Sequence, residues 1–188
     1  LVNGLVLAGT CLGMQKKDKI ITGSTIRPGD KIIGVPSTGI HSNGLSLARA
    51  VVEKYANYEE RLKNGRTLGE ELLIPTRIYH ESLQVAATCT VHGMCHITGG
   101  GLLNFKRLSP YGFLVDTPVT PPEIFSWIQK TGDISMDEMY RTFNMGMGYA
   151  YIVPTDSVAG VQKMVKGAQI VGEIIKEPGA WLGRTEIT

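Results

Sequence analysis

Hydrophobic and polar positions alternate along the chain in blocks that predict strands and helices in turn. Short apolar runs bounded by turn residues predict strands at residues 31–36, 91–98, 111–116, 146–153 and 170–176. Apolar residues at three- and four-residue spacing predict helices at residues 44–56, 75–88, 123–130, 135–143 and 156–166, with a further helical stretch ending near residue 108. The fold class that follows is α+β (mixed α/β), with helices packed on a mixed β-sheet.

Turn and cap residues set the expected ends of several elements. Pro75 is placed in the first turn of its helix, and Asp156 is expected to cap another. Residues 57–71 are mostly polar and are expected to form an exposed excursion. Pro178 and Gly179 turn the last long strand, so that residues 181–187 are expected to close a hairpin against it. In the helix at 44–56, the predicted buried face consists of Leu45, Ala48, Val52 and Tyr55.

The first part of the chain is expected to belong to a different domain from the rest. Residues 1–15 predict one or two strands, and residues 19–22 predict a returning strand. A short polar link follows, so we expect residues 1–24 to be the remnant of a preceding domain with its linker, and residues 25–188 to form a second domain. The chain starts at Leu1, inside an apolar pattern, which reads as a fragment whose N-terminal part is missing.

The composition is that of an ordinary globular protein and argues against several classes of function. The net charge is +2 and the basic residues are scattered, which does not favour a nucleic acid or a membrane surface as partner. No apolar run approaches the ~20 residues that span a bilayer, and we expect no signal peptide. The three cysteines lack C-x-x-C spacing and favour buried thiols in a reducing compartment. A metal site built from Cys95, His92 and His96 is disfavoured, because a strand would separate these side chains.

The most polar loop of the chain lies between a predicted strand and a predicted helix. Residues 37–44 read Ser-Thr-Gly-Ile-His-Ser-Asn-Gly and bring hydroxyl, imidazole and amide groups into one turn. The helix start adds free N–H groups and a positive dipole end, which suit an anionic ligand. Ser42 or Asn43 serves equally well as a helix cap, worth about 1 kcal/mol. The cluster as a whole favours a binding site.

Two further stretches also carry groups that suit an anionic ligand. Residues 96–101, His-Ile-Thr-Gly-Gly-Gly, end a strand and open a helix, and the glycines permit close approach to a phosphate. They match neither a Walker A loop nor the dinucleotide fingerprint, and a flexible turn is the alternative. A third stretch carries Arg141 and Asn144; a guanidinium there suits a phosphate or a carboxylate, although a pair with Asp137 explains it as well. Arg77 at a helix start also suggests an anionic partner, because the helix dipole disfavours a cation there, although exposure at the surface explains this arginine nearly as well.

Taken together, these stretches resemble the C-terminal half of the aminoimidazole ribonucleotide synthetase family, also called phosphoribosylformylglycinamidine cyclo-ligase, of purine biosynthesis. The matching segments cover nearly the whole chain in order, at residues 34–49, 73–79, 96–101 and 139–146, with supporting matches at 19–24, 28–30 and 171–175. The wider superfamily includes selenophosphate synthetase and thiamine monophosphate kinase. Those members often have an aspartate where His96 stands, so this histidine favours the cyclo-ligase.

The resemblance implies a two-step reaction in which ATP phosphorylates the formyl oxygen of formylglycinamidine ribonucleotide and an amidine nitrogen then closes the imidazole, releasing phosphate. It implies His41 and His96 as the candidates for proton transfer, and the sequence leaves the choice between them open. The implied cofactors are ATP and magnesium, with the magnesium ligands expected mainly in the missing N-terminal domain and none in this chain. The implied substrate- and phosphate-binding residues are Ser37, Thr38, Ser42, Asn43, Gly44, Arg77, Thr98, Gly99, Gly100, Gly101, Arg141 and Asn144.

The resemblance also implies a cytoplasmic enzyme whose full-length form is a homodimer, with a small-molecule ribonucleotide as partner and no nucleic acid or membrane. Because the family's N-terminal domain carries most of the ATP site, the chain alone is expected to be inactive.

Two alternatives for the function stay open. One is another ATP-dependent superfamily member, selenophosphate synthetase-like or amidotransferase-like. The other is a non-catalytic binding module of the same fold.

Overall fold

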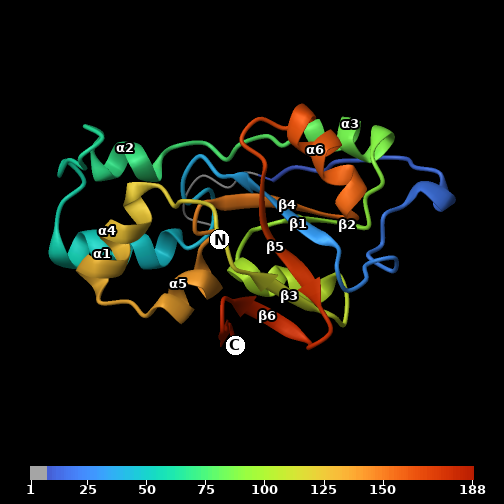
Figure 1. Cartoon of the computed structure of the whole chain (residues 1–188). Coiled ribbons are helices and arrows are strands. Elements are labelled where there is room, and N and C mark those ends of the chain that lie inside the picture. Colours follow the sequence, from blue (N-terminus) through green and yellow to red (C-terminus); the bar gives the residue numbers. More distant parts are fainter. Residues whose placement is uncertain (1–7) are drawn as a thin grey trace.

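A mixed β-sheet forms the centre of the molecule in a computed structural model that describes residues 8–188 (Figure 1). Its strands lie in the order β2-β4-β1-β5-β3-β6-β7, and β3 with β6 is the parallel pair among the antiparallel neighbours of the described chain. The strands are β1 (Lys31–Pro36), β2 (Gly93–His96), β3 (Gly112–Val115), β4 (Met147–Val153), β5 (Gln169–Ile175), β6 (Gly179–Leu182) and β7 (Thr185–Glu186). The predicted fold class is confirmed.

The helices form two groups that cover opposite faces of this sheet. In Figure 1, α1, α2, α4 and α5 gather on the left, while α3 and α6 lie together at the upper right. The α-helices are α1 (Leu45–Tyr55), α2 (Leu68–Leu72), α3 (Glu81–Thr88), α4 (Glu123–Gly132), α5 (Met136–Thr142) and α6 (Val158–Met164). The 3-10 helices are η1 (Lys17–Lys19), η2 (Gly101–Arg107) and η3 (Thr155–Ser157). None of these helices combines the length and the apolar character that crossing a bilayer requires.

The central strands β1 and β4 are almost entirely apolar because both of their faces are buried. On β1, Ile32 packs into the larger core with α1 and α4, whereas Ile33 packs into the smaller core with α3 and α6. On β4, Ile152 and Tyr151 alternate in the same way. Since successive side chains of a strand point to opposite faces, a strand between two helix layers is an unbroken apolar run.

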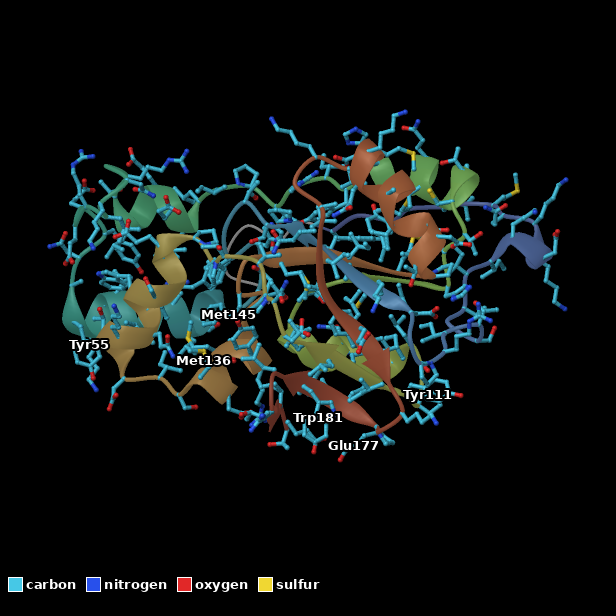
Figure 2. The ribbon with its side chains drawn as sticks, in the orientation of Figure 1. Tyr55, Tyr111, Met136, Met145, Glu177 and Trp181 are labelled. Carbon is cyan, nitrogen blue, oxygen red and sulfur yellow. The ribbon has the colours of Figure 1, made fainter. Side chains whose placement is uncertain are left out.

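The helix expected at residues 75–88 begins later than predicted. Residues 74–80 are irregular and α3 starts at Glu81, because the Arg77 guanidinium and the Tyr79 hydroxyl each donate to the Pro36 carbonyl at 3.4 Å and hold this segment against the end of β1. The predicted packing faces also need correction. Ile78, whose spacing predicts that it shares one helix face with Ser82 and Val85, is 80% exposed, and Tyr55 of α1 is 52% exposed at the outer edge of the molecule (Figure 2).

Other expected boundaries were wrong at the chain ends and in one hairpin. Residues 8–15 and 20–22 form no strand, contrary to the prediction, and the part of the predicted N-terminal strands at residues 1–7 lies outside the described residues. Asp156 lies within η3 and does not cap α6, whose N-cap residue Ser157 makes no capping hydrogen bond. The strand β5 forms no hairpin with the chain end, because β3 lies between β5 and β6. The hairpin is β6 with β7, near Trp181 at the lower edge of Figure 2.

The excursion at residues 57–71 is partly helical rather than wholly irregular. Thr67 caps α2 in a capping box, in which its hydroxyl accepts from the Glu70 N–H and the Glu70 carboxylate accepts from the Thr67 N–H. The side chains of Leu62 and Leu68 are buried against the larger core. This short helix therefore depends on its cap and on two apolar anchors.

Replacing the cap is expected to destabilise this corner of the protein. Thr67→Ala should lower the free energy of unfolding by about 1 kcal/mol, since one N–H of the first helical turn loses its acceptor. The midpoint of urea denaturation measures the loss. Thr67→Ser is the matched control, because it retains the hydroxyl and should change stability far less. Equal losses in both variants would contradict a capping role.

Candidate functional site

The polar loop at residues 37–44 is held between the start of β4 and the segment before α3. The Ser37 N–H donates to the Gly146 carbonyl at 2.8 Å, which continues the β1–β4 pairing by one residue. The Thr38 hydroxyl donates to the Pro75 carbonyl at 2.8 Å, and the Ser42 hydroxyl lies 3.2 Å from that of Thr76. The hydroxyls of this loop thus face a neighbouring segment that lies more than thirty residues away along the chain.

His41 occupies the most constrained position of this loop. Its φ of 61° lies in the left-handed region, which non-glycine residues rarely adopt and which costs of order 1–3 kcal/mol. The side chain is only 4% exposed, and its Nε2 accepts a hydrogen bond from the Thr38 N–H at 3.3 Å. A strained, buried histidine of this kind is typical of a functional site.

A second histidine and two tyrosines surround His41. His96 ends β2, and its ring centroid lies 6.3 Å from that of His41. The Tyr79 ring lies 6.2 Å from His41 and 5.7 Å from His96, and Tyr149 lies 5.1 Å from Tyr79. We call these four residues the His–Tyr cluster. The two histidines implied by the family resemblance are therefore brought together, from different elements.

Burial sets the charge of this cluster. Burial first, and the nearby His96 second, together lower the pKa of His41 to about 4. Burial also lowers the pKa of His96 from its ordinary value and raises the pKa values of Tyr79 and Tyr149. All four groups therefore favour their neutral forms at neutral pH.

The glycine loop at residues 98–101 meets the polar loop through Asn43. A Cβ atom on Gly99 would lie 3.0 Å from the Asn43 Oδ1, so the Asn43 side chain lies close against the backbone of Gly99. The buried Asn104 shapes the loop from inside, since its Nδ2 donates to the carbonyls of Gly99 at 3.3 Å and Gly101 at 2.8 Å. Asn104 was not expected from the sequence. An amide within an otherwise apolar helical stretch was the available signal.

Buried polar atoms without a partner gather beside the polar loop. Among the described residues, these side-chain atoms are Ser37 Oγ, His41 Nδ1 and Glu81 Oε2. Glu81 belongs to the same place, because its other oxygen accepts from Arg77 at 2.7 Å and Arg77 in turn donates to the carbonyl of Pro36. An unpaired buried polar atom costs about 1–3 kcal/mol, so such atoms mark a site that serves more than folding. Glu81 also went unnoticed in the sequence.

The three remaining predicted side chains have partners within the protein. The Arg77 guanidinium pairs with Glu81 and lies 5.2 Å from the centre of the Tyr79 ring. Arg141 is half-exposed and lies 3.9 Å from Asp137, which is the pair that the four-residue spacing offered as the alternative. Asn144 is buried; its Nδ2 donates to the Gly39 carbonyl and its Oδ1 accepts from the Gly146 N–H, each at 2.9 Å. Asn144 thus ties the polar loop to the start of β4.

Residues 8–188 hold no group of three His, Cys, Asp or Glu side chains placed to bind a metal ion. His92 is engaged by the buried Asp30, whose Oδ2 lies 2.7 Å from the His92 Nδ1. Cys95 points into the larger core, away from its neighbour His96. The chemistry proposed below therefore uses none of the described side chains as a metal ligand.

Gly148 on β4 is the position where a methyl group is expected to disturb the His–Tyr cluster most directly. An added Cβ would overlap the Tyr79 hydroxyl and lie 2.7 Å from the His41 Cε1. Gly148→Ala should lower the free energy of unfolding by about 1–3 kcal/mol, as overpacking does, and should shift the ring resonances of both residues in an NMR spectrum. Gly39→Ala is the matched control, since its nearest neighbour would be Ile74 Cβ at 3.8 Å. Unchanged ring resonances in Gly148→Ala would contradict the packing described here.

The mixed sheet with its two layers of helices defines a class of α+β fold that solved structures of known proteins share. Thiamine monophosphate kinase from Aquifex aeolicus superposes with a TM-score of 0.57 at 13% identity, covering 89% of this chain and 54% of that one. PurL from T. maritima, in a structure complexed with ATP, superposes with a TM-score of 0.51 at 17% identity, covering 92% of this chain and 26% of that one. At such low identity, these likenesses show the fold alone.

Sequence similarity gives the family. The profile of "AIR synthase related protein, C-terminal domain" matches residues 27–182, and the chain belongs to this family. Phosphoribosylformylglycinamidine cyclo-ligase from Methanosarcina barkeri is 48% identical over 179 residues, which is 94% of this chain and 54% of that protein. The protein of the same name from Thermococcus gammatolerans is 46% identical over 186 residues, or 95% of this chain and 54% of that protein. The resemblance seen in the sequence is confirmed, and the chain spans about half the length of these relatives.

Proposed function

We propose that this chain is the C-terminal part of a phosphoribosylformylglycinamidine cyclo-ligase. The observation that carries the proposal is the meeting of two loops in a chain that is 48% identical to a relative of that name. His41 and Asn43 from one loop come together with His96 and Gly99 from the other. The proposed reaction converts formylglycinamidine ribonucleotide and ATP into aminoimidazole ribonucleotide, ADP and phosphate.

The proposed chemistry has two steps. ATP transfers its terminal phosphoryl group to the formyl oxygen of the substrate, so that an O–P bond forms and ADP leaves. An amidine nitrogen then attacks the activated carbon and loses a proton, while the C–O bond breaks and phosphate leaves. Both steps need hydrogen-bond donors and a fixed substrate position more than covalent help from the protein.

The two loops are proposed to divide these tasks. The polar loop holds the ribonucleotide and the glycine loop lies at the transferred phosphoryl group, with backbone N–H groups as donors. Arg77 supports the polar loop from beside Tyr79, and Asn144 supports it from beneath. In this proposal Arg141 contacts the substrate only after its exposed ion pair with Asp137 breaks. The proposed substrate-binding set is Ser37, Thr38, Ser42, Asn43 and Gly44, and the proposed phosphoryl-binding set is Thr98, Gly99, Gly100 and Gly101.

The wider assembly is part of the same proposal. We propose that residues 1–24 link this domain to an N-terminal half that binds most of the ATP and any magnesium, and that the full-length protein is a cytoplasmic homodimer. The chain's span of about half of its relatives supports such a division, as does the start of the family match at residue 27. The isolated chain is accordingly expected to form no stoichiometric ADP in a turnover assay.

Calorimetric titration of the chain with formylglycinamidine ribonucleotide, and separately with ATP, tests the proposal. We expect binding of the ribonucleotide that weakens by about 5- to 150-fold in Asn43→Ala, because leaving a ligand group without its hydrogen-bond partner costs about 1–3 kcal/mol. Ser46→Ala is the matched control, since Ser46 is exposed on α1 just beyond the loop. Binding that Asn43→Ala leaves unchanged would place the substrate elsewhere. If the chain alone binds neither compound, the same pair of variants in the full-length protein decides the question.

A further inference from the structure

The hydrogen bonds of His41 fix the position of its proton. A neutral imidazole has one nitrogen that donates and one that accepts. The Nε2 accepts from the Thr38 backbone N–H at 3.3 Å, and a backbone amide can only donate. The proton of the neutral ring must therefore lie on Nδ1, which is buried and has no partner among the described residues.

The same geometry prevents His41 from accepting a proton from the substrate. The lone pair of Nε2 is occupied by the Thr38 N–H, and the residue is 4% exposed. The ring also has little room to turn, because Tyr79 packs against it and the backbone of Gly148 lies close to its Cε1. A group that takes a proton from the substrate needs a nitrogen with a free lone pair, and the Nε2 lone pair of His41 is not free.

His96 differs from His41 in each of these respects. It is exposed at the end of β2, three residues before Gly99 of the glycine loop. No hydrogen bond to another described side chain or backbone group occupies its ring nitrogens. Its ring is nevertheless oriented, because Tyr79 and Tyr149 lie 5.7 Å and 6.2 Å away. It is therefore accessible and held in place, as a proton-transfer group must be.

The charged groups around the two histidines do not change this difference between His41 and His96. The ionisable groups nearest to the two imidazoles are the hydroxyls of Tyr79 and Tyr149, which burial keeps neutral. Arg77 and Glu81 approach from the side of α3, but they pair with each other at 2.7 Å. The two imidazoles are 6.3 Å apart, so a positive charge on one disfavours a charge on the other. One histidine of the pair can gain a proton while its neighbour stays neutral.

We propose that His96 carries the proton transfer and that His41 is a positioning residue, held as the neutral Nδ1–H tautomer. In the proposed ring closure, a His96 nitrogen takes the proton of the attacking amidine nitrogen as the new N–C bond forms. The C–O bond breaks, and phosphate leaves with its electron pair. The reaction step rests on the proposed function, whereas the tautomer of His41 does not.

Nitrogen-15 NMR of the histidine rings in the chain tests the tautomer directly. Between pH 5 and pH 8 we expect His41 to show a protonated Nδ1 and an unprotonated Nε2 throughout, and we expect His96 to gain a proton before His41 does as the pH falls. An Nε2–H tautomer of His41, or its titration in place of His96, would overturn the proposal. This result needs no ligand and stands whatever the chain's reaction proves to be.

Addition of formylglycinamidine ribonucleotide to the same sample tests the contact with substrate. We expect the His96 ring signals and the amide signals of the glycine loop to shift, with the His41 tautomer unchanged. If the loop amides shift and the His96 ring does not, the role of His96 is overturned while the proposed function stands. If nothing shifts in the chain or in the full-length protein, both the substrate contact and the proposed function fail.

Kinetics of the full-length protein separate the two roles. His96→Gln should lower kcat by about 10²–10⁴-fold, the usual contribution of general acid–base catalysis, with a small change in KM. His41→Asn retains an N–H near the Nδ1 position and should act mainly on KM. An equal loss of kcat in both variants, or a pH dependence of kcat that survives His96→Gln and is lost in His41→Asn, would overturn the assignment.

Discussion

Acidification from pH 6.5 to pH 4 is expected to remove on the order of 3 kcal/mol of folding free energy through His41 alone. The pKa of this buried side chain is lowered from 6.5 to about 4 in the folded protein. Between these two values, the unfolded chain binds a proton that the folded protein does not, so stability falls as the pH falls. Above pH 6.5 both states are neutral at this residue, and it contributes no pH dependence.

Urea denaturation at half-unit steps from pH 7.5 to pH 4.5 measures this effect, with His41→Asn as the comparison. The variant should lose less stability over the range, and the difference between the two proteins should grow steadily below pH 6.5. Part of the acid dependence should persist in the variant, because burial lowers the pKa of His96 in the same direction. Parallel stability curves for wild type and variant would show that the His41 ring is not desolvated as described.

Asn144→Ala is expected to lower the free energy of unfolding by about 2–4 kcal/mol and to disorder the polar loop. Both polar atoms of the Asn144 side chain are used by the backbone, one by the Gly39 carbonyl and one by the Gly146 N–H. These groups are buried, so truncation leaves a donor and an acceptor without partners. Denaturant unfolding measures the loss, and the NMR signals of residues 37–44 report on the loop.

Arg141→Ala is the matched control for this variant. It removes a longer side chain three residues away, but Arg141 is half-exposed and its pair with Asp137 is weak, so stability should change by less than about 0.5 kcal/mol. The comparison also separates two roles for Asn144. A residue that only contacts the ligand would weaken binding and leave stability intact, and that outcome would contradict the structural role argued here.

Much of the fold follows from local pattern. The strands at residues 31–36 and 146–153 and the helix at 44–56 are found within one or two residues of their predicted bounds. The sequence patterns that predict these elements extend over many residues, and the burial of both strand faces makes the strands almost continuously apolar. The turn chemistry at Asp133 also acts locally, since the chain there adopts a left-handed conformation that ends α4.

The errors arose where partners distant in the sequence decide the conformation. Residues 74–80 have helical spacing, yet contacts with Pro36 and the polar loop hold them in an irregular course. The last strands look like a hairpin with β5, yet β3 pairs between them and takes β6 as a parallel neighbour. Periodicity reports which side of an element is buried, but it does not name the element that buries it.

Some features of the candidate site likewise follow from local sequence, and others follow only from the tertiary structure. The sequence by itself determined the family, the polar and glycine loops and the two histidines, because these signals lie within short stretches of fixed spacing. Only the tertiary structure decided that His41 and His96 are neighbours, that Asn144 and Arg77 bind protein groups, and that Asn104 and Glu81 belong to the site. The tautomer of His41 was also decided by the tertiary structure, because the position of its proton depends on the burial of the ring and on a hydrogen-bond partner in three dimensions.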